Sequence, residues 1–316
     1  MAGPGQRVAV VDLGTNSTRL LVADVVDGRL NELERRTTVT RLGQDVEATG
    51  RLADEAIARV GEALAAYREV IDRLGAETVV AVATSAMRDA QNGPDFQDHI
   101  RKRFGIDPRT ISGDKEARLT FAGAIGGRST EADAEALVID IGGGSTEYVT
   151  GRARRAPGFH VSTRMGSVRF TERHLRSDPP APEEMAALAD DVRAVLAAEL
   201  PGEILERVED GIAVAGTATT LAAIDQQLDP YDPEKVDGYR FNRGAAERIV
   251  AQLAALPLDE RSRTIGLHPD RAPTIVAGTV IMLESMRAFD LEEIEVSESD
   301  LLHGAALAGR LEGGPT

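Results

Sequence analysis

The sequence predicts an α/β protein made of two similar halves. Short apolar runs rich in Val and Ile, which are typical of buried strands, alternate with segments whose apolar residues recur at helical spacing. A chain of 316 residues is long for one hydrophobic core, so two domains are expected. One hairpin motif also occurs twice, since Asp12 and Asp140 lie 128 positions apart, as do Ser17 and Ser145. A repeat of that length corresponds to a whole domain.

The second copy of the motif is the stretch LVIDIGGGSTE at residues 137–147. It predicts a buried strand, a tight turn and a second strand. Successive glycines allow a positive φ and a close approach to a ligand, and the peptide N–H groups of such a turn suit phosphate oxygens. Asp140 and Glu147 would flank the turn and could hold a divalent cation. A glycine-rich hairpin without a ligand is the alternative interpretation of this copy alone.

The first copy is the stretch VVDLGTNST at residues 10–18. Its Asp, first Gly, Ser and Thr match those of the second copy at the same offset. Two such turns that face each other across a cleft would bind a phosphate chain from both sides, so the repeat favours a phosphate site. We therefore expect domains at residues 1–128 and 129–316, each opening on one of these turns.

In the first half, the expected elements are strands at 7–12, 18–26 and 29–40, a helix at 54–74, a strand at 78–83, a helix at 94–104 and a short strand near 110–111. Arg41 lies in the loop after the third strand and could reach the cleft. Arg88 follows the fourth strand, where a parallel strand delivers side chains to a site. Glu116 stands in the first turn of a helix that begins near Ser112, although an acid there is also ordinary capping and dipole chemistry.

The second half follows a linker at 126–134 that is rich in Gly, Ser, Thr and acids. Its expected elements are a strand–turn–strand at 137–150, a turn that opens a helix at 164–169, helices at 183–200 and 275–289, and a strand at 295–297. Between them, a strand at 212–215 leads into a glycine turn at Gly216 and a helix start at Thr217. A helix N-terminus suits an anion, but a well-capped helix without a ligand fits the same residues.

The composition limits the class of protein. Hydrophobic residues make up 42% of the chain, no apolar stretch reaches membrane-spanning length, and no signal sequence opens the chain. No cysteine is present, and the five histidines show no zinc spacing. A net charge of −16 disfavours binding to nucleic acid or to an anionic membrane. We therefore expect a cytoplasmic protein with no nucleic acid or membrane partner.

One segment, residues 152–176, carries a net positive charge, and we call it the basic stretch. Between residues 152 and 176, seven arginines stand against the single acid Glu172. The arginines are Arg152, Arg154, Arg155, Arg164, Arg169, Arg173 and Arg176. The basic stretch is a candidate path for an anionic substrate, and the alternative is an ordinary solvated face.

An Asp-x-Gly-x-x-Ser-Thr hairpin in each half resembles the superfamily of actin, sugar kinases, heat-shock chaperones and acetate kinase. The stretches SGDKEA at 112–117 and RMGSVR at 164–169 are similar to motifs of the exopolyphosphatase / guanosine pentaphosphate phosphohydrolase family. The resemblance extends from Val8 to about Gly309. It implies two duplicated actin-like (ribonuclease H-like) ATPase-type domains with a cleft between them, and a homodimer.

The resemblance also implies roles for the residues at matching positions. Glu116 would be the catalytic base that activates a water molecule. Asp12, Asp140 and Glu147 would hold Mg²⁺ or another divalent cation, and K⁺ is a further candidate cation. The expected phosphate-binding residues are Gly14, Thr15, Asn16, Ser17, Arg41, Arg88, Gly142, Gly143, Gly144, Ser145, Thr146, Arg164, Gly166, Ser167, Gly216 and Thr217.

The chain departs from the family pattern at Lys115, where many relatives have a second acid, at Pro273, and at Leu302 and His303, where relatives often have Leu-Arg-Glu-Gly. The leading hypothesis is Mg²⁺-dependent release of terminal phosphate from inorganic polyphosphate. Hydrolysis of guanosine pentaphosphate by the same groups is the main alternative. A kinase or ATPase of the superfamily, and a non-catalytic sensor that binds guanosine tetraphosphate or polyphosphate, are the remaining ones.

Overall fold

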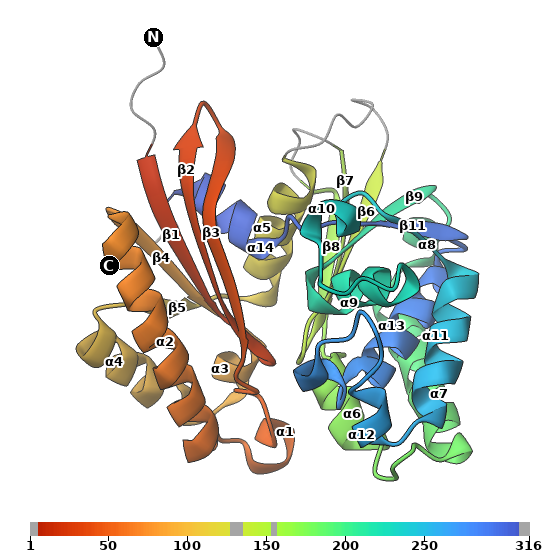
Figure 1. Cartoon of the computed structure of the whole chain (residues 1–316). Coiled ribbons are helices and arrows are strands. Elements are labelled where there is room, and N and C mark those ends of the chain that lie inside the picture. Colours follow the sequence, from red (N-terminus) through yellow and green to blue (C-terminus); the bar gives the residue numbers. More distant parts are fainter. Residues whose placement is uncertain (1–5, 127–134, 153–156, 310–316) are drawn as a thin grey trace. The chain divides into compact units, whose positions relative to one another are not determined.

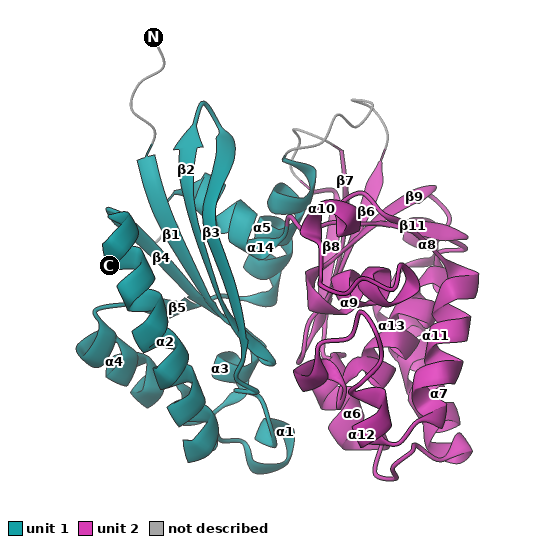
Figure 2. Ribbon diagram, in the orientation of Figure 1, with its two compact units in different colours: residues 1–128, 300–316 teal, residues 129–299 magenta. Residues whose placement is uncertain are grey.

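The computed structural model describes residues 6–126, 135–152 and 157–309. The chain divides into two compact units, one formed by residues 1–128 and 300–316 and the other by residues 129–299 (Figure 2). Each unit consists of one β-sheet with helices packed on it (Figure 1). No helix within the described ranges has both the length and the apolar character needed to cross a membrane.

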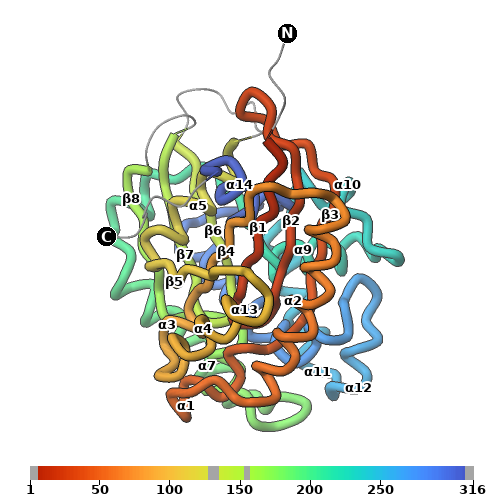
Figure 3. The backbone as a smooth tube through the Cα atoms, turned by 90° about the vertical axis from the view of Figure 1, so that its left-hand side faces the viewer, coloured from red at the N-terminus to blue at the C-terminus, as the bar shows by residue number. Residues whose placement is uncertain are grey.

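The sheet of the first unit has five strands in the order β3-β2-β1-β4-β5, and β1, β2 and β4 run side by side (Figure 3). β1 pairs antiparallel with β2 and parallel with β4. Alternate side chains of β1 face opposite ways, so Val8 and Val10 belong to one core cluster and Val11 and Leu13 to another. The strands are β1 (Gln6–Leu13), β2 (Ser17–Val26), β3 (Arg29–Val39), β4 (Thr78–Ala83) and β5 (Pro108–Thr110).

Helices cover both faces of this sheet. Val60, Leu64 and Ile71 of α2 pack against one face, and Leu302 and Ala305 of α14 pack against the other. The helices of the unit are α1 (Val46–Thr49), α2 (Asp54–Leu74), α3 (Ser85–Asp89), α4 (Gly93–Phe104), α5 (Gly113–Ile125) and α14 (Leu301–Ala308).

The placement of α14 differs from the expected domain division, which assigned everything from 129 to 316 to the second domain. The helix groups with the first unit because its apolar residues complete the core over Val8 and Val10. A sequence linker marks only the first passage between the units, and the return of the chain after residue 299 leaves no such mark. The expected boundary between 128 and 129 lies outside the described residues.

The sheet of the second unit has six strands in the order β10-β11-β9-β6-β7-β8. Read from β8, it repeats the first sheet: β8, β7 and β6 are antiparallel neighbours, and β9 and β11 follow in parallel. This repeated order confirms the predicted duplicated α/β fold. The strands are β6 (Ala136–Ile141), β7 (Thr146–Gly151), β8 (Phe159–Thr163), β9 (Asp210–Val214), β10 (Arg240–Asn242) and β11 (Glu293–Val296).

Helix α13 lies in the core of the second unit, with nearly all of its residues buried. The helices of this unit are α6 (Ser167–His174), α7 (Pro182–Glu199), α8 (Gly202–Leu205), α9 (Ala215–Asp225), α10 (Pro233–Val236), α11 (Arg243–Ala255), α12 (Leu258–Arg261) and α13 (Ile275–Ala288), with a 3-10 turn at Pro269–Arg271. The predicted strand–turn–strand motif forms β6 and β7, and the start of α6 packs against its turn.

Candidate functional site

The two copies of the motif form the same hairpin. In the first, the Gly14 N–H donates to the Ser17 carbonyl at 3.0 Å, and in the second the Gly142 N–H donates to the Ser145 carbonyl at 3.0 Å. Both turns connect the first two antiparallel strands of their sheet. The sequence repeat is therefore a structural repeat down to its hydrogen bonds.

Helix α6 occupies the carbonyl side of the second turn. Three successive carbonyl oxygens accept from its first residues: Gly142 from the N–H of Ser167 (2.9 Å), Gly143 from the N–H of Val168 (2.8 Å) and Gly144 from the Nε of Arg169 (2.8 Å). Ser167 is thus engaged in holding the turn through its backbone N–H. The side chain of Thr146 also contributes, because its hydroxyl donates to the Met165 carbonyl at 2.5 Å.

These bonds determine where the N–H groups of the turn point. In a planar trans peptide the N–H points opposite to the C=O, and these peptides are trans. The N–H groups of Gly143, Gly144 and Ser145 therefore point away from α6. Within the described residues these three groups meet no hydrogen-bond acceptor. Consecutive peptide N–H groups with one orientation form a concave site for the oxygens of an anion such as phosphate.

The three glycines of the turn do not use the positive φ that glycine allows. The prediction was that they adopt a positive φ, and none of the three does. Close packing acts instead at Gly166, at the start of α6, where a Cβ would lie 2.5 Å from the carbonyl oxygen of Gly143. Gly166 therefore lets the helix approach the backbone of the turn directly.

The first turn is held in an analogous way by the loop at residues 40–43. Its N–H groups donate to the carbonyls of Thr15 (from Gly43, 2.8 Å) and Asn16 (from Thr40 and Arg41, 3.1 and 2.9 Å). By the same peptide geometry, the N–H groups of Asn16 and Ser17 point away from that loop. Arg41 was expected to reach the phosphates with its side chain, and its backbone N–H braces the turn.

Asp140 and Glu147 are direct cross-strand partners in the β6–β7 ladder, so their side chains lie on one face of the hairpin. Both residues are buried, at 6% and 1% exposure. Glu147 accepts a hydrogen bond from the Ser162 hydroxyl at 2.6 Å. Two carboxylates directly opposite each other repel unless a cation or proton intervenes, which suits a hard divalent cation. No group of three or more acids and histidines suited to a metal occurs in the described part of the chain.

The first hairpin carries a different pair at the same positions. Asp12 is opposite Arg19, which donates to its Oδ2 from Nε at 2.9 Å. The other oxygen, Oδ1, is buried and has no hydrogen-bond partner among the residues described. Burial raises the pKa of Asp12, and the charge of Arg19 offsets part of that rise. Sequence reasoning missed Arg19, although the offset of 128 places it opposite Asp12 as Glu147 is opposite Asp140.

Glu116 and Arg88, which are far apart in the sequence, meet in the first unit. Arg88 lies on the short helix α3, which follows the fourth strand, and its Nη1 is 3.4 Å from Glu116 Oε2. The same Nη1 donates to the Ile111 carbonyl at 2.8 Å. The cap of α5 is Ser112, whose side chain accepts from the Lys115 N–H at 3.2 Å. Ser112, and not Glu116, therefore caps α5. The buried Glu116 carboxylate contacts Arg88 instead.

Gly216 and Thr217 lie in the first turn of α9, which begins at Ala215, so the helix starts two residues before the expected position. The Thr217 hydroxyl donates to the Ile141 carbonyl at 3.2 Å, which links α9 to the end of β6. A Cβ on Gly216 would lie 2.0 Å from Nη1 of Arg271, so this guanidinium packs on the first turn of the helix. The sequence alone did not single out Arg271.

The basic stretch does not behave as one surface where the structure describes it. Arg164 is exposed, Arg169 is buried against the glycine turn, and Arg173 is paired with Asp191 at 3.1 Å. Arg154 and Arg155 lie outside the described residues. At least Arg169 therefore has a structural task, which is to hold the turn.

Comparison with known proteins gives consistent results over the whole chain. Residues 21–309 match the sequence profile of the Ppx/GppA phosphatase family. Exopolyphosphatase 2 of Mycobacterium tuberculosis is 38% identical over 315 residues, which covers 96% of this chain and 98% of that protein. The Ppx/GppA enzyme of Aquifex aeolicus has a TM-score of 0.80 and 33% identity, covering 96% of this chain and 100% of the other. An exopolyphosphatase structure from Cytophaga hutchinsonii has a TM-score of 0.89 and 28% identity, covering 98% and 100%.

Proposed function

The chain belongs to the Ppx/GppA phosphatase family and is a phosphoanhydride hydrolase, and we propose that it releases the terminal phosphate of inorganic polyphosphate with the help of Mg²⁺. The observation that carries the proposal is the row of three outward N–H groups at Gly143, Gly144 and Ser145, which fits phosphate oxygens. The similarity to an exopolyphosphatase along nearly the full length of both proteins supports the choice of substrate.

In the proposed reaction, Glu116 is the general base. Its carboxylate accepts a proton from a water molecule while the water oxygen attacks the terminal phosphorus. The bond from that phosphorus to the bridging oxygen breaks, and the bridging oxygen leaves on the shortened chain. The contact with Arg88 at 3.4 Å supports this role, because it holds the carboxylate in one place. Outward peptide N–H groups stabilise charge on phosphate oxygens as the bond breaks.

Residues of this chain fit a divalent cation. Asp140 and Glu147 offer two buried carboxylates from one face of one hairpin of the second unit. In the first unit, considered by itself, Asp12 has a buried oxygen without a hydrogen-bond partner among the residues described. Mg²⁺ is commonly held by one or two carboxylates, with waters and substrate phosphates as its other ligands. When bound, the ion would offset negative charge on the phosphoryl group being transferred.

The test is phosphate release from long-chain polyphosphate and from guanosine pentaphosphate, side by side, with and without Mg²⁺. We expect release from polyphosphate that requires Mg²⁺. Glu116→Gln keeps the size of the side chain and loses the proton acceptor, so kcat should fall by about 10²–10⁴, the usual contribution of a general base, with KM retained. The matched control is Asp114→Asn, an exposed acid in the same helical turn, which should keep the parental kcat.

Each other outcome rejects a specific part of the proposal. Release from guanosine pentaphosphate alone would make that compound the substrate. Binding of either compound without release would indicate a sensor. Turnover of Glu116→Gln within a few-fold of the parent would leave Glu116 as a helix-start acid.

A further inference from the structure

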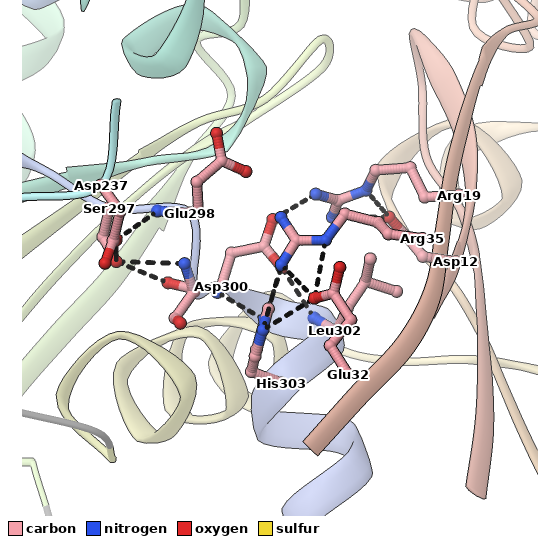
Figure 4. Close-up of polar contacts among 11 residues, drawn as sticks. Asp12, Arg19, Glu32, Arg35, Asp237, Ser297, Glu298, Asp300, Leu302 and His303 are labelled. Atoms are coloured by element: carbon pink, nitrogen blue, oxygen red, sulfur yellow. Dashed lines mark hydrogen bonds and ion pairs between the residues drawn. The ribbon is translucent and has the colours of Figure 1, made fainter. Parts of the chain in front are cut away.

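The chain returns from the second unit to the first at Asp300, which is 5% exposed. Arg19 bridges this residue and Asp12: its Nη1 donates to Oδ2 of Asp300, and its Nε donates to Oδ2 of Asp12 at 2.9 Å (Figure 4). One guanidinium thus pairs with two buried carboxylates from distant parts of the sequence. Such charge-assisted bonds to a planar fork are strong and directional.

The other side of the Asp300 carboxylate is fixed by α14. Its Oδ1 accepts from the N–H of Leu302 at 2.9 Å, which caps the helix. The backbone N–H of Asp300 lies 3.3 Å from Nδ1 of His303, which completes a capping box (Figure 4). Both oxygens of the Asp300 carboxylate therefore have hydrogen-bond partners. Because Asp300 caps α14, the position of this helix determines where the Asp300 carboxylate lies relative to Arg19.

Helix α14 is in turn held against α5 by direct backbone contact. A Cβ on Gly123 of α5 would lie 1.9 Å from the carbonyl oxygen of Asp300, and a Cβ on Gly304 of α14 would lie 1.8 Å from that of Leu119. The two helices lie side by side in Figure 1. Since Glu116 is in the first turn of α5, the backbone at Asp300 and the helix that carries Glu116 cannot move independently.

We propose that Asp300 is a positioning residue for the hydrolysis, which aligns Asp12 through Arg19 and, through its backbone, the helix that bears Glu116. The inference rests on the proposed function, because it takes Glu116 and Asp12 as parts of the site. Arg19 occupies one oxygen of Asp12 and leaves Oδ1 as the oxygen available to a ligand. Without the charge of Asp300, Arg19 loses the ion pair that holds its Nη1, and the orientation of Asp12 is less well fixed.

The electrostatics of Asp300 agree with this arrangement. Burial is the largest single influence and raises its pKa, but the charge of Arg19, together with His303 and Arg35, lowers the pKa below its ordinary value. Asp300 therefore remains an anion at neutral pH and offers Arg19 a full charge.

The first test is Asp300→Asn, which preserves size and leaves a side-chain oxygen for the helix cap but removes the charge that holds Arg19. We expect kcat for phosphate release to fall about 10- to 100-fold, with KM changed less than about threefold, because alignment is lost and substrate binding is not. The matched control is Asp237→Asn. Asp237 accepts from the Glu298 N–H at 3.0 Å, on the second-unit side of the same crossing (Figure 4), and the variant should keep the parental kcat within about twofold.

The second test asks whether Asp300 acts through Arg19. Arg19→Lys keeps a charge but loses the fork that reaches both carboxylates, so it should show the same fall in kcat. If the two residues act together, the double variant Arg19→Lys/Asp300→Asn is no slower than Arg19→Lys alone. Losses that multiply in the double variant, or a parental kcat in Asp300→Asn, overturn the proposal. Should Asp300→Asn not fold, a parental kcat in Arg19→Lys overturns it.

Failure of the proposed function gives a different result. If the parent releases phosphate from neither substrate, the assigned reaction is wrong, and the same four proteins still test the network by urea unfolding. If the urea midpoint of the double variant shifts by the sum of the two single-variant shifts, Arg19 and Asp300 are not coupled. That result would overturn the inference. Shifts that do not add up support the coupling independently of activity.

Discussion

Arg19 and Glu147 stand at equivalent positions of the two hairpins and give them different chemistry. Each lies directly across from an aspartate, Asp12 in one case and Asp140 in the other. The first pair is an ion pair, whereas the second consists of two acids on one face of the hairpin. The second hairpin therefore offers a hard cation two acids, whereas the first offers one acid with one of its oxygens bound by Arg19.

This difference leads to a prediction about the metal. Asp140→Asn and Glu147→Gln should each raise the Mg²⁺ concentration needed for half-maximal activity, because hard cations prefer charged oxygen ligands. Asp210→Asn, an exposed acid on the neighbouring strand β9, is the matched control and should have no effect. The measurement is activity against Mg²⁺ at fixed polyphosphate. Unchanged Mg²⁺ dependence in both site variants would mean that these acids are structural.

Single residues of the site differ in how far the sequence could identify them. Glu116 and Arg88 were each expected at a site, and the structure brings them within 3.4 Å of one another. Asp300 was not singled out, because an aspartate before a helix is ordinary capping and nothing local indicates that it also contacts Arg19. Contacts between residues hundreds of positions apart depend on the tertiary fold and leave no local pattern.

At the scale of elements, long and periodic segments were predicted well. The helix Asp54–Leu74 and the strand Thr78–Ala83 have the predicted bounds. The short helix Ser85–Asp89 was missed, because five residues cannot display a helical period. The direction of the N–H groups in the glycine turn also needed the structure, since it follows from how α6 packs on the carbonyl side.

The contact between α6 and the glycine turn can be tested through Gly166. In Gly166→Ala the new Cβ would meet the Gly143 carbonyl at 2.5 Å, so the helix must move away from the turn. We expect a loss of about 1–3 kcal/mol in the free energy of unfolding, as for other overpacked sites, and a raised KM for polyphosphate. Urea unfolding and steady-state kinetics measure the two effects.

Gly202→Ala is the control for this prediction. A Cβ at Gly202 meets nothing within 4 Å, so alanine should be neutral or slightly stabilising there. Parental stability and KM in Gly166→Ala would contradict the packing argument.

At the scale of the whole molecule, the repeated motif was sufficient to predict two halves of one fold. The repeat could not indicate that residues 300–309 join the first unit, because that depends on which core their apolar side chains complete. Nor could the net charge of −16 indicate how individual arginines are used. Arg169, for example, is buried against the glycine turn.

The distribution of charge gives a prediction that separates long from short substrates. Replacing Arg152, Arg154 and Arg155 together with alanine should raise KM for long-chain polyphosphate and weaken its salt dependence, because fewer counterions are displaced on binding. Tripolyphosphate and guanosine pentaphosphate are too short to reach many of these arginines, so their KM should change little. Arg173→Ala, whose guanidinium is paired with Asp191, is the control. Equal losses for all three substrates would contradict selective binding, and no loss would make this segment a solvated face.

The return of α14 to the first unit has a consequence for the order in which the protein folds during synthesis. A ribosome releases residues 6–126 first, but Val8 and Val10 remain uncovered until Leu302 and Ala305 emerge. All of the second unit, residues 129–299, is made in that interval and has its own core. The half of the protein that is translated first is therefore the half that finishes folding last.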